Sequence, residues 1–173
     1  MHNFKTEGII IRRTNFGEAD RVLTIVTRDS GKIKIIAKGV RKITSRRAPN
    51  LELFTQTSFV IHKGRSGNYV IEAKAVQPFE HMRTDFDRVK IAYQIAELIN
   101  ILTREEEELA EVYSLVAASF YRLNDGLQFN IVAFKHKLLM LLGFVSETSH
   151  DANLDSYIEE IAQRRLYARG IYE

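Results

Sequence analysis

The chain has 173 residues, of which 45% are hydrophobic and 27% charged, a balance typical of a globular protein. It contains no cysteine, which excludes disulfides, thiolate zinc sites and cysteine nucleophiles. No segment approaches the roughly 18 consecutive apolar residues of a membrane span, and the first twenty residues do not follow the pattern of a secretory signal. We therefore expect a cytoplasmic protein that makes no membrane contact.

The net charge of +3 conceals two parts of opposite sign. Residues 1–78 contain 15 Lys and Arg against 6 Asp and Glu, a net charge of +9, whereas residues 79–173 contain 10 against 16, a net charge of −6. Clustered positive charge attracts the phosphates of nucleic acids far more strongly than scattered charge does. The segregation therefore predicts that the amino-terminal part binds nucleic acid.

Short runs rich in Val, Ile, Thr and Phe predict five antiparallel strands in the amino-terminal part. Turn residues at 29–31 and 66–68 predict two tight connections, and the longer break at 39–53, which contains Pro49, predicts a loop with at most one short helix. Three strands, a long connection and two strands is the order of an OB-fold, although an SH3-like barrel also fits. The predicted strands span residues 5–13, 21–27, 32–38, 55–63 and 69–76.

After Pro78 the apolar residues recur every three or four positions, which predicts four amphipathic helices near 86–102, 112–123, 127–142 and 154–161. Thr84 is the predicted N-cap of the first helix, while Gly143 and Gly170 are predicted to end helices. The acidic run 105–108 is predicted to begin the second helix, where carboxylates favour the helix dipole. The expected fold class is α+β, with a five-stranded OB-fold β-barrel in 1–78 and a small all-α helical domain in 79–173.

The third predicted strand and the loop after it contain seven basic residues and no acidic one between positions 32 and 47. In the strand, lysines alternate with apolar residues, so one face is predicted to be cationic and the other to lie in the core. Ile36 stands on the lysine side, which predicts a bulge or partial coverage there. A face that served only solubility would carry interspersed Asp and Glu. The predicted DNA-binding residues are Lys32, Lys34, Lys38, Arg41, Lys42, Arg46 and Arg47, extended by Arg12, Arg13, Arg21, Lys63 and Arg65.

Two further features near the first loop are candidate functional groups. Phe16 follows two arginines and is a candidate for base stacking, with a place in the core as the alternative. Glu18 and Asp20 are a minor candidate for a Mg²⁺ site, and more simply part of a turn. The five histidines show no metal-ligand spacing, and no nucleotide-hydrolysis or esterase motif occurs. We therefore expect no catalytic residue, no metal and no cofactor.

Several short segments share one family resemblance and occur in the same order along the chain. In the amino-terminal part they are TEGII at 6–10, GEADR at 17–21, GKI at 31–33, AKGVR at 37–41, LELF at 51–54 and GR at 64–65. In the helical part they are FKHKLLMLLGF at 134–144 and RRLYAR at 164–169. Together these segments resemble the bacterial recombination mediator family RecO, the last two its central helix and its carboxy-terminal element. RecO proteins are commonly longer, and many carry a four-cysteine zinc module that this sequence lacks.

The resemblance implies an OB-fold followed by a helical domain, and a nucleoid-associated protein that binds single- and double-stranded DNA and anneals complementary strands. It also implies two partners: RecR, and the single-strand-binding protein SSB, whose acidic tail the family binds through its helical domain. The implied activity includes help in placing RecA on SSB-covered DNA. The basic residues of the third strand and its loop match the DNA-contacting surface of the family.

Two other functions remain open from the sequence. A general RNA- or ribosome-associated OB-fold protein would use the same basic face and would not accelerate annealing. A metal-dependent nuclease using Glu18 and Asp20 would cleave DNA with Mg²⁺, and Asp20→Ala would abolish that cleavage.

Overall fold

The computed structural model describes residues 2–146 and 153–168. The chain divides into two compact units, one formed by residues 1–79 with 105–113 and the other by residues 80–104 with 114–173. The sequence had placed 105–113 in the helical domain, and the structure corrects this because that segment packs with the strands. Each unit is described by itself.

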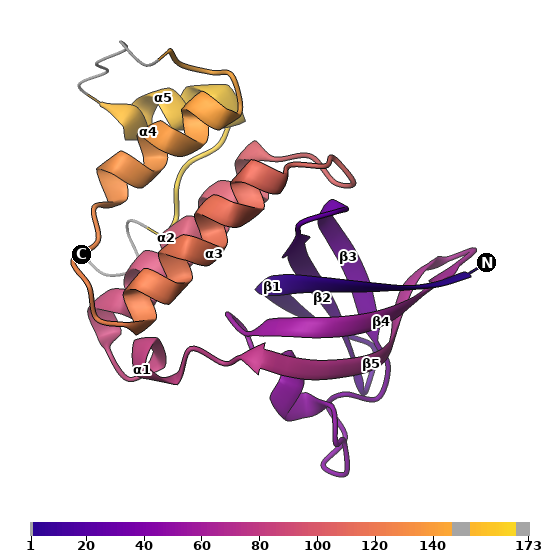
Figure 1. Cartoon of the computed structure of the whole chain (residues 1–173). Helices are drawn as coiled ribbons and strands as arrows, with labels where there is room; N and C mark the ends of the chain where they lie inside the picture. The colour runs from indigo at the N-terminus through magenta and orange to yellow at the C-terminus, as the bar shows by residue number, and fades with distance from the viewer. Residues whose placement is uncertain (1, 147–152, 169–173) are drawn as a thin grey trace. The chain divides into compact units, whose positions relative to one another are not determined.

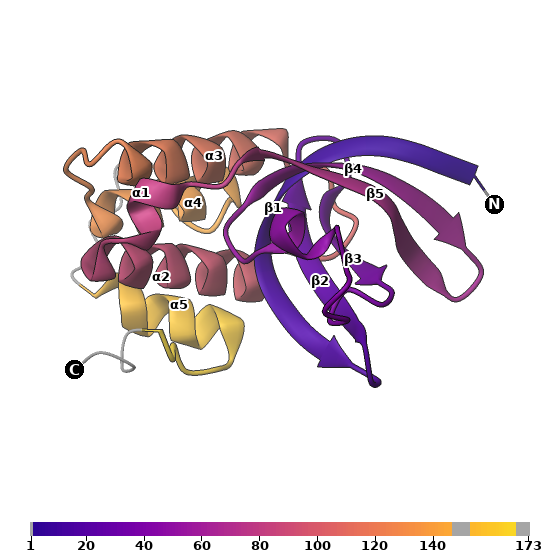
Figure 2. The same cartoon turned by 90° about the horizontal axis from the view of Figure 1, so that it is seen from below.

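The first unit is a closed five-stranded barrel (Figures 1 and 2). Its strand order is β1-β2-β3-β5-β4, with β4 returning to β1, and the short β3–β5 pairing is parallel while the other pairs are antiparallel. This is the OB-fold arrangement, which confirms that prediction and excludes the SH3-like alternative. The strands are β1 (His2–Phe16), β2 (Asp20–Thr27), β3 (Gly31–Ala37), β4 (Gln56–Gly64) and β5 (Gly67–Gln77).

Strand β1 is long because it pairs with two neighbouring strands, β4 and β2. Its first half pairs with β4 and its second half with β2, and the register with β2 shifts between Ile10 and Arg12. Such an irregularity bends a strand and increases its twist, which a small closed barrel requires. The predicted strand, 5–13, therefore fell short at both ends. The 39–53 break was predicted to be a loop or to carry one short helix, and it contains the 3-10 helix η1 (Ala48–Leu51), which includes Pro49.

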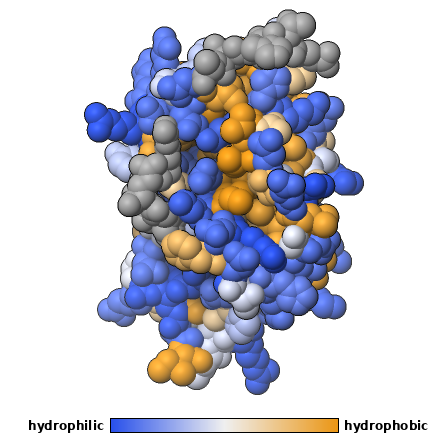
Figure 3. Space-filling view, turned by 90° about the vertical axis from the view of Figure 1, so that its left-hand side faces the viewer, coloured by the Kyte–Doolittle hydropathy of each residue, from blue (hydrophilic) through white to orange (hydrophobic). Residues whose placement is uncertain are grey.

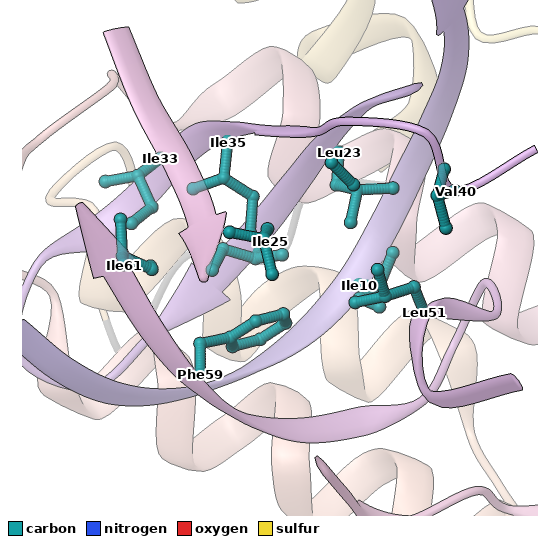
Figure 4. Packing of buried hydrophobic residues seen from close by; sticks show 11 residues of the cluster. Ile10, Leu23, Ile25, Ile33, Ile35, Val40, Leu51, Phe59 and Ile61 are labelled. Carbon is teal, nitrogen blue, oxygen red and sulfur yellow. The ribbon is translucent and has the colours of Figure 1, made fainter. Parts of the chain in front are cut away.

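The barrel interior is filled by aliphatic side chains around one aromatic ring (Figure 4). Phe59 of β4 is 1% exposed, and Ile33, Ile35 and Ala37 of β3 point inward as their alternation predicted. Deleting a buried phenylalanine side chain costs about 3 to 5 kcal/mol, so this core holds the barrel together without disulfides. The buried cluster is Ile10, Leu23, Ile25, Ile33, Ile35, Ala37, Val40, Leu51, Phe59, Ile61 and Val70.

The acidic run Glu105–Glu108 does not begin a helix; that prediction was wrong. The backbone N–H of Glu106 donates to the carbonyl of Lys32 at 2.9 Å, and Lys32 forms a parallel bridge with Glu105. Strand β5 pairs with β3 only at Ile35 and Ile36. The acidic segment therefore covers the half of β3 that would otherwise present an unpaired edge. Pairing with a distant strand is not visible in the local pattern.

Gly31 allows this close approach. Its φ is +61°, and a Cβ atom there would lie 1.7 Å from the carbonyl oxygen of Glu107. Both the left-handed backbone and the absence of a side chain are required at this position.

The helices are α1 (Glu80–Arg83), α2 (Phe86–Leu102), α3 (Ala110–Asn124), α4 (Ile131–Leu141) and α5 (Leu154–Ala162), and all lie in the helical unit except the first turn of α3, which belongs to the first unit. The four predicted helices are confirmed, α2 with the predicted bounds and the other three with shifted ends, and α1 was missed because it is a single turn. Within the described parts of the chain, no helix has the length and apolar character needed to cross a membrane.

The helix caps differ in part from the prediction. Asp85, and not Thr84, caps α2, because its carboxylate accepts from the backbone N–H groups of Asp87 and Arg88. Thr84 instead donates its hydroxyl proton to the carbonyl of His81 at 2.9 Å. Asn130 caps α4, so that helix begins four residues later than predicted. Gly143 has the expected positive φ of +77°, while Gly170 lies outside the described residues.

Candidate nucleic-acid interface

The outer face of β3 is only partly open. Lys34 is exposed as predicted, but Lys32 is only 6% exposed because the acidic segment covers it. Burial lowers the pKa of the Lys32 ammonium, and the nearby Glu105 carboxylate opposes that shift. Ile36 is half-buried, and its strand pairs with β2 in unbroken register, so partial coverage and not a bulge explains its place.

Several predicted cations are held in the barrel by other groups. Lys34 forms an ion pair with Glu105, Nζ to Oε1 at 2.5 Å, and Arg13 forms one with Glu52 at 2.6 Å. The Arg47 guanidinium donates to the carbonyls of Val70 at 2.8 Å and Lys38 at 2.7 Å. These three side chains hold neighbouring segments together, and a nucleic acid would have to compete with those contacts.

The remaining cations of this region gather where β3 ends and the next loop begins. Lys38, Arg41, Lys42 and Arg46 are exposed, and we name these four the loop face. The Lys38 ammonium lies 5.0 Å from the centre of the Tyr69 ring, a cation–π distance that limits its motion without removing its charge. The loop extends away from the strands at the lower edge of Figure 1.

Arg41 connects the loop face to the β1–β2 turn. Its backbone N–H donates to the carbonyl of Ala19 at 2.9 Å, and its guanidinium donates to the carbonyl of Gly17 at 3.2 Å. Phe16, the residue before Gly17, is 55% exposed and is not part of the core. The aromatic ring and the cations therefore lie on two connected segments of the barrel.

A shallow depression of about 610 Å³ lies between these two segments. It is lined by Lys38 and Lys42 together with Glu18 and Asp20. The Asp20 carboxylate accepts a hydrogen bond from the backbone N–H of Gly39 at 2.7 Å, so it has the turn-forming role expected of it. Among residues 2–146 and 153–168, no group of three or more His, Asp or Glu side chains is placed to hold a metal ion.

The outlying predicted cations are placed as follows. Arg12 is exposed at the β1 irregularity, and Arg21 is half-buried with its Nε donating to Asn15 at 3.4 Å. Lys63 and Arg65 are exposed at the β4–β5 turn. All four remain predicted phosphate contacts, outside the loop face.

A second surface, which the sequence did not predict, lies in the helical unit. A pocket of about 550 Å³ between α3 and α4 has a mostly apolar lining with Arg122 and Lys137 among it. Leu127 and Val132 beside it are 52% and 59% exposed, and the face in Figure 3 carries a band of hydrophobic surface over this unit. The apolar residues from 127 onward could have indicated this surface. Their three-to-four periodicity instead predicts a helix face that is buried in the core. The apolar lining consists of Leu115, Ala118, Phe129, Ala133 and Phe134.

Comparison with known proteins agrees with both units. Residues 1–79 match the family described as "Recombination protein O N terminal", and residues 83–164 match "Recombination protein O C terminal".

Curated relatives named "DNA repair protein RecO" also match. The protein of Roseiflexus sp. (strain RS-1) is 36% identical over 163 residues, covering 93% of this chain and 57% of the relative. That of Desulfitobacterium hafniense (strain DCB-2) is 35% identical over 121 residues, or 70% of this chain and 44% of the relative. That of Bacillus velezensis (strain FZB42) is 30% identical, covering 84% and 58%. The chain thus spans about half the length of the relatives it matches, and on both family matches it belongs to the RecO family.

Proposed function

We propose that the chain binds single- and double-stranded DNA through phosphate contacts of the loop face and anneals complementary strands. The observation that carries this proposal is the exposure of Lys38, Arg41, Lys42 and Arg46 on one loop, which Arg41 ties to the β1–β2 turn by two hydrogen bonds. Exposed lysines and arginines bind phosphates by releasing condensed counterions, which requires no sequence readout. Reducing the repulsion between two phosphate backbones favours their pairing, so annealing requires no covalent chemistry and no cofactor.

The outlying cations and Phe16 extend this site in the proposal. Arg12, Arg21, Lys63 and Arg65 add phosphate contacts around the barrel, and the Phe16 ring stacks on a base. Lys32, Lys34, Arg13 and Arg47 contribute less, because each is buried or already paired.

Strand annealing with SSB-coated complementary oligonucleotides tests the proposal. The substitutions Lys38→Gln and Lys42→Gln together should slow annealing at least fivefold, whereas Lys5→Gln with Lys74→Gln, exposed elsewhere on the barrel, should change it less than twofold. Equal rates for the two variants would reject the loop face as the site. DNA binding without faster annealing would favour an RNA- or ribosome-associated protein, and Mg²⁺-dependent cleavage would favour a nuclease.

The pocket between α3 and α4 supports a second part of the proposal, the binding of a protein partner. An apolar lining with Arg122 and Lys137 suits an acidic peptide that inserts an apolar side chain and pairs its carboxylates with the cations. This is the chemistry of an acidic SSB tail, and we assign that tail to this pocket. Contacts with RecR and help in loading RecA belong to the same proposal.

A fluorescent peptide with the SSB tail sequence tests the assignment. Lys137→Glu should weaken its binding more than tenfold, since an attractive charge is replaced by a repulsive one. Lys74→Glu, on the barrel, is the control with the same change of charge. Equal affinities of the two variants would contradict the assignment.

A further inference from the structure

The tip of the basic loop carries a fully exposed isoleucine. Ile43 has a relative exposure of 105%, the largest among the exposed apolar side chains of the described residues. It occupies a corner of a turn that is closed by the backbone N–H of Ser45, which donates to the carbonyl of Lys42 at 2.9 Å. Single exposed apolar residues are ordinary, so the surroundings of Ile43 decide its meaning.

Those surroundings are cationic on both sides. Arg41 and Lys42 precede Ile43 and Arg46 follows it, and all three side chains are exposed. A lipid headgroup layer or an acidic protein would also be attracted to these charges. The spacing of an apolar tip between cations fits an unpaired nucleotide most directly, because each nucleotide offers an apolar base face beside a phosphate.

The tip is presented on a loop that is anchored at both ends. Before it, Arg41 is hydrogen bonded to Ala19 and Gly17 of the β1–β2 turn. After it, the Arg47 guanidinium bridges the carbonyls of Lys38 and Val70. A protrusion held in this way loses little conformational freedom when a ligand binds.

We propose that Ile43, with Phe16 on the connected turn, contacts unpaired bases, so that this end of the barrel favours single strands over duplex. Proteins that insert isoleucine or phenylalanine between the base steps of a duplex must partly unstack them, whereas an unpaired base offers the same apolar face without that cost. In an intact duplex the base faces are stacked on one another, and exposing one costs unstacking energy. The inference rests on the proposed DNA binding by the loop face and adds base contact to it.

The test compares Ile43→Ala with Ile71→Ala, which removes the same atoms from a 47% exposed isoleucine on β5. Binding is measured to a fluorescent oligothymidylate, to an abasic oligomer of equal length and to a duplex. Ile43→Ala should weaken oligothymidylate binding about fivefold, equivalent to about 1 kcal/mol for one base contact, with no change for the abasic oligomer. Ile71→Ala should change none of the three, and unchanged melting temperatures would show that both variants fold.

Two outcomes overturn the inference. If Ile43→Ala leaves oligothymidylate binding unchanged, or weakens abasic and base-containing oligomers equally, bases do not contact the tip; DNA binding by the loop face then stands. If the wild-type protein binds none of the oligonucleotides, the proposed function fails together with the inference.

Discussion

Two lysines that look alike in the sequence, Lys34 and Lys38, have different environments in the barrel. Lys34 is paired with Glu105, whereas Lys38 lies over the Tyr69 ring and forms no ion pair among the residues that the structure describes. A phosphate that binds Lys34 must displace a carboxylate, and one that binds Lys38 need not.

This difference gives a prediction for single substitutions. Lys38→Gln should weaken binding to an oligonucleotide about threefold or more, whereas Lys34→Gln should weaken it less than twofold, because its charge is already partly neutralised. Titration of a fluorescent oligonucleotide in 50 mM salt would measure both. A larger loss for Lys34→Gln would indicate that the acidic segment leaves β3 when DNA binds.

Tyr113 gives a prediction for stability at high pH. Its hydroxyl donates to Glu7 at 3.3 Å, and Gln56 donates to the same carboxylate at 2.7 Å. Burial, followed by the Glu7 charge, raises the pKa of Tyr113 to about 12 from 10.0. The folded chain therefore keeps this proton where the unfolded chain releases it, so the contribution of Tyr113 is complete below pH 10 and is lost as pH rises toward 12.

The free energy of unfolding should therefore fall more steeply between pH 10 and 12 for the wild type than for Tyr113→Phe, in denaturant titrations at several pH values. At pH 8 the variant should be about 1 kcal/mol less stable, from the lost hydrogen bond. Parallel pH curves for the two proteins would contradict the assigned environment of the phenol.

At the scale of elements, the acidic segment is part of the barrel and not the start of a helix. Its backbone pairs with β3 at Lys32, and Gly31 passes beneath Glu107. For the proposed function, this means that the proposed phosphate contacts lie on the loop at the end of β3 and not at the centre of the strand.

Alanine substitutions at the two turn glycines, Gly17 and Gly31, distinguish the cost of backbone strain from the cost of a steric clash. Gly31 and Gly17 have similar φ values, +61° and +56°, but a Cβ atom at Gly17 would meet nothing within 4 Å. Gly17→Ala should cost about 1 kcal/mol of stability, from strain alone. Gly31→Ala should cost at least 2 kcal/mol more, because it also displaces the acidic segment. Equal losses in thermal unfolding would mean that the segment does not dock on β3.

At the scale of the whole molecule, local patterns predicted most of the architecture. Alternation identified all five strands and the inward side of β3, and the three-to-four periodicity identified the four longer helices. The pairing of 105–106 with β3, the burial of Lys32 and the partners of Arg13 and Arg47 depend on residues far away in the chain. No local pattern reports such contacts, so the sequence predicted which cations lie in this region but not which of them are buried or paired.

The salt dependence of binding to a single-stranded oligonucleotide tests the loop face most directly. Each phosphate contact adds about 0.7 to the magnitude of the slope of log affinity against log salt. Lys38→Gln with Lys42→Gln should therefore reduce that slope by about 1.4, while Lys5→Gln with Lys74→Gln, the same loss of charge elsewhere on the barrel, should leave it unchanged. Equal reductions in both variants would show that net charge, and not the loop face, holds the nucleic acid.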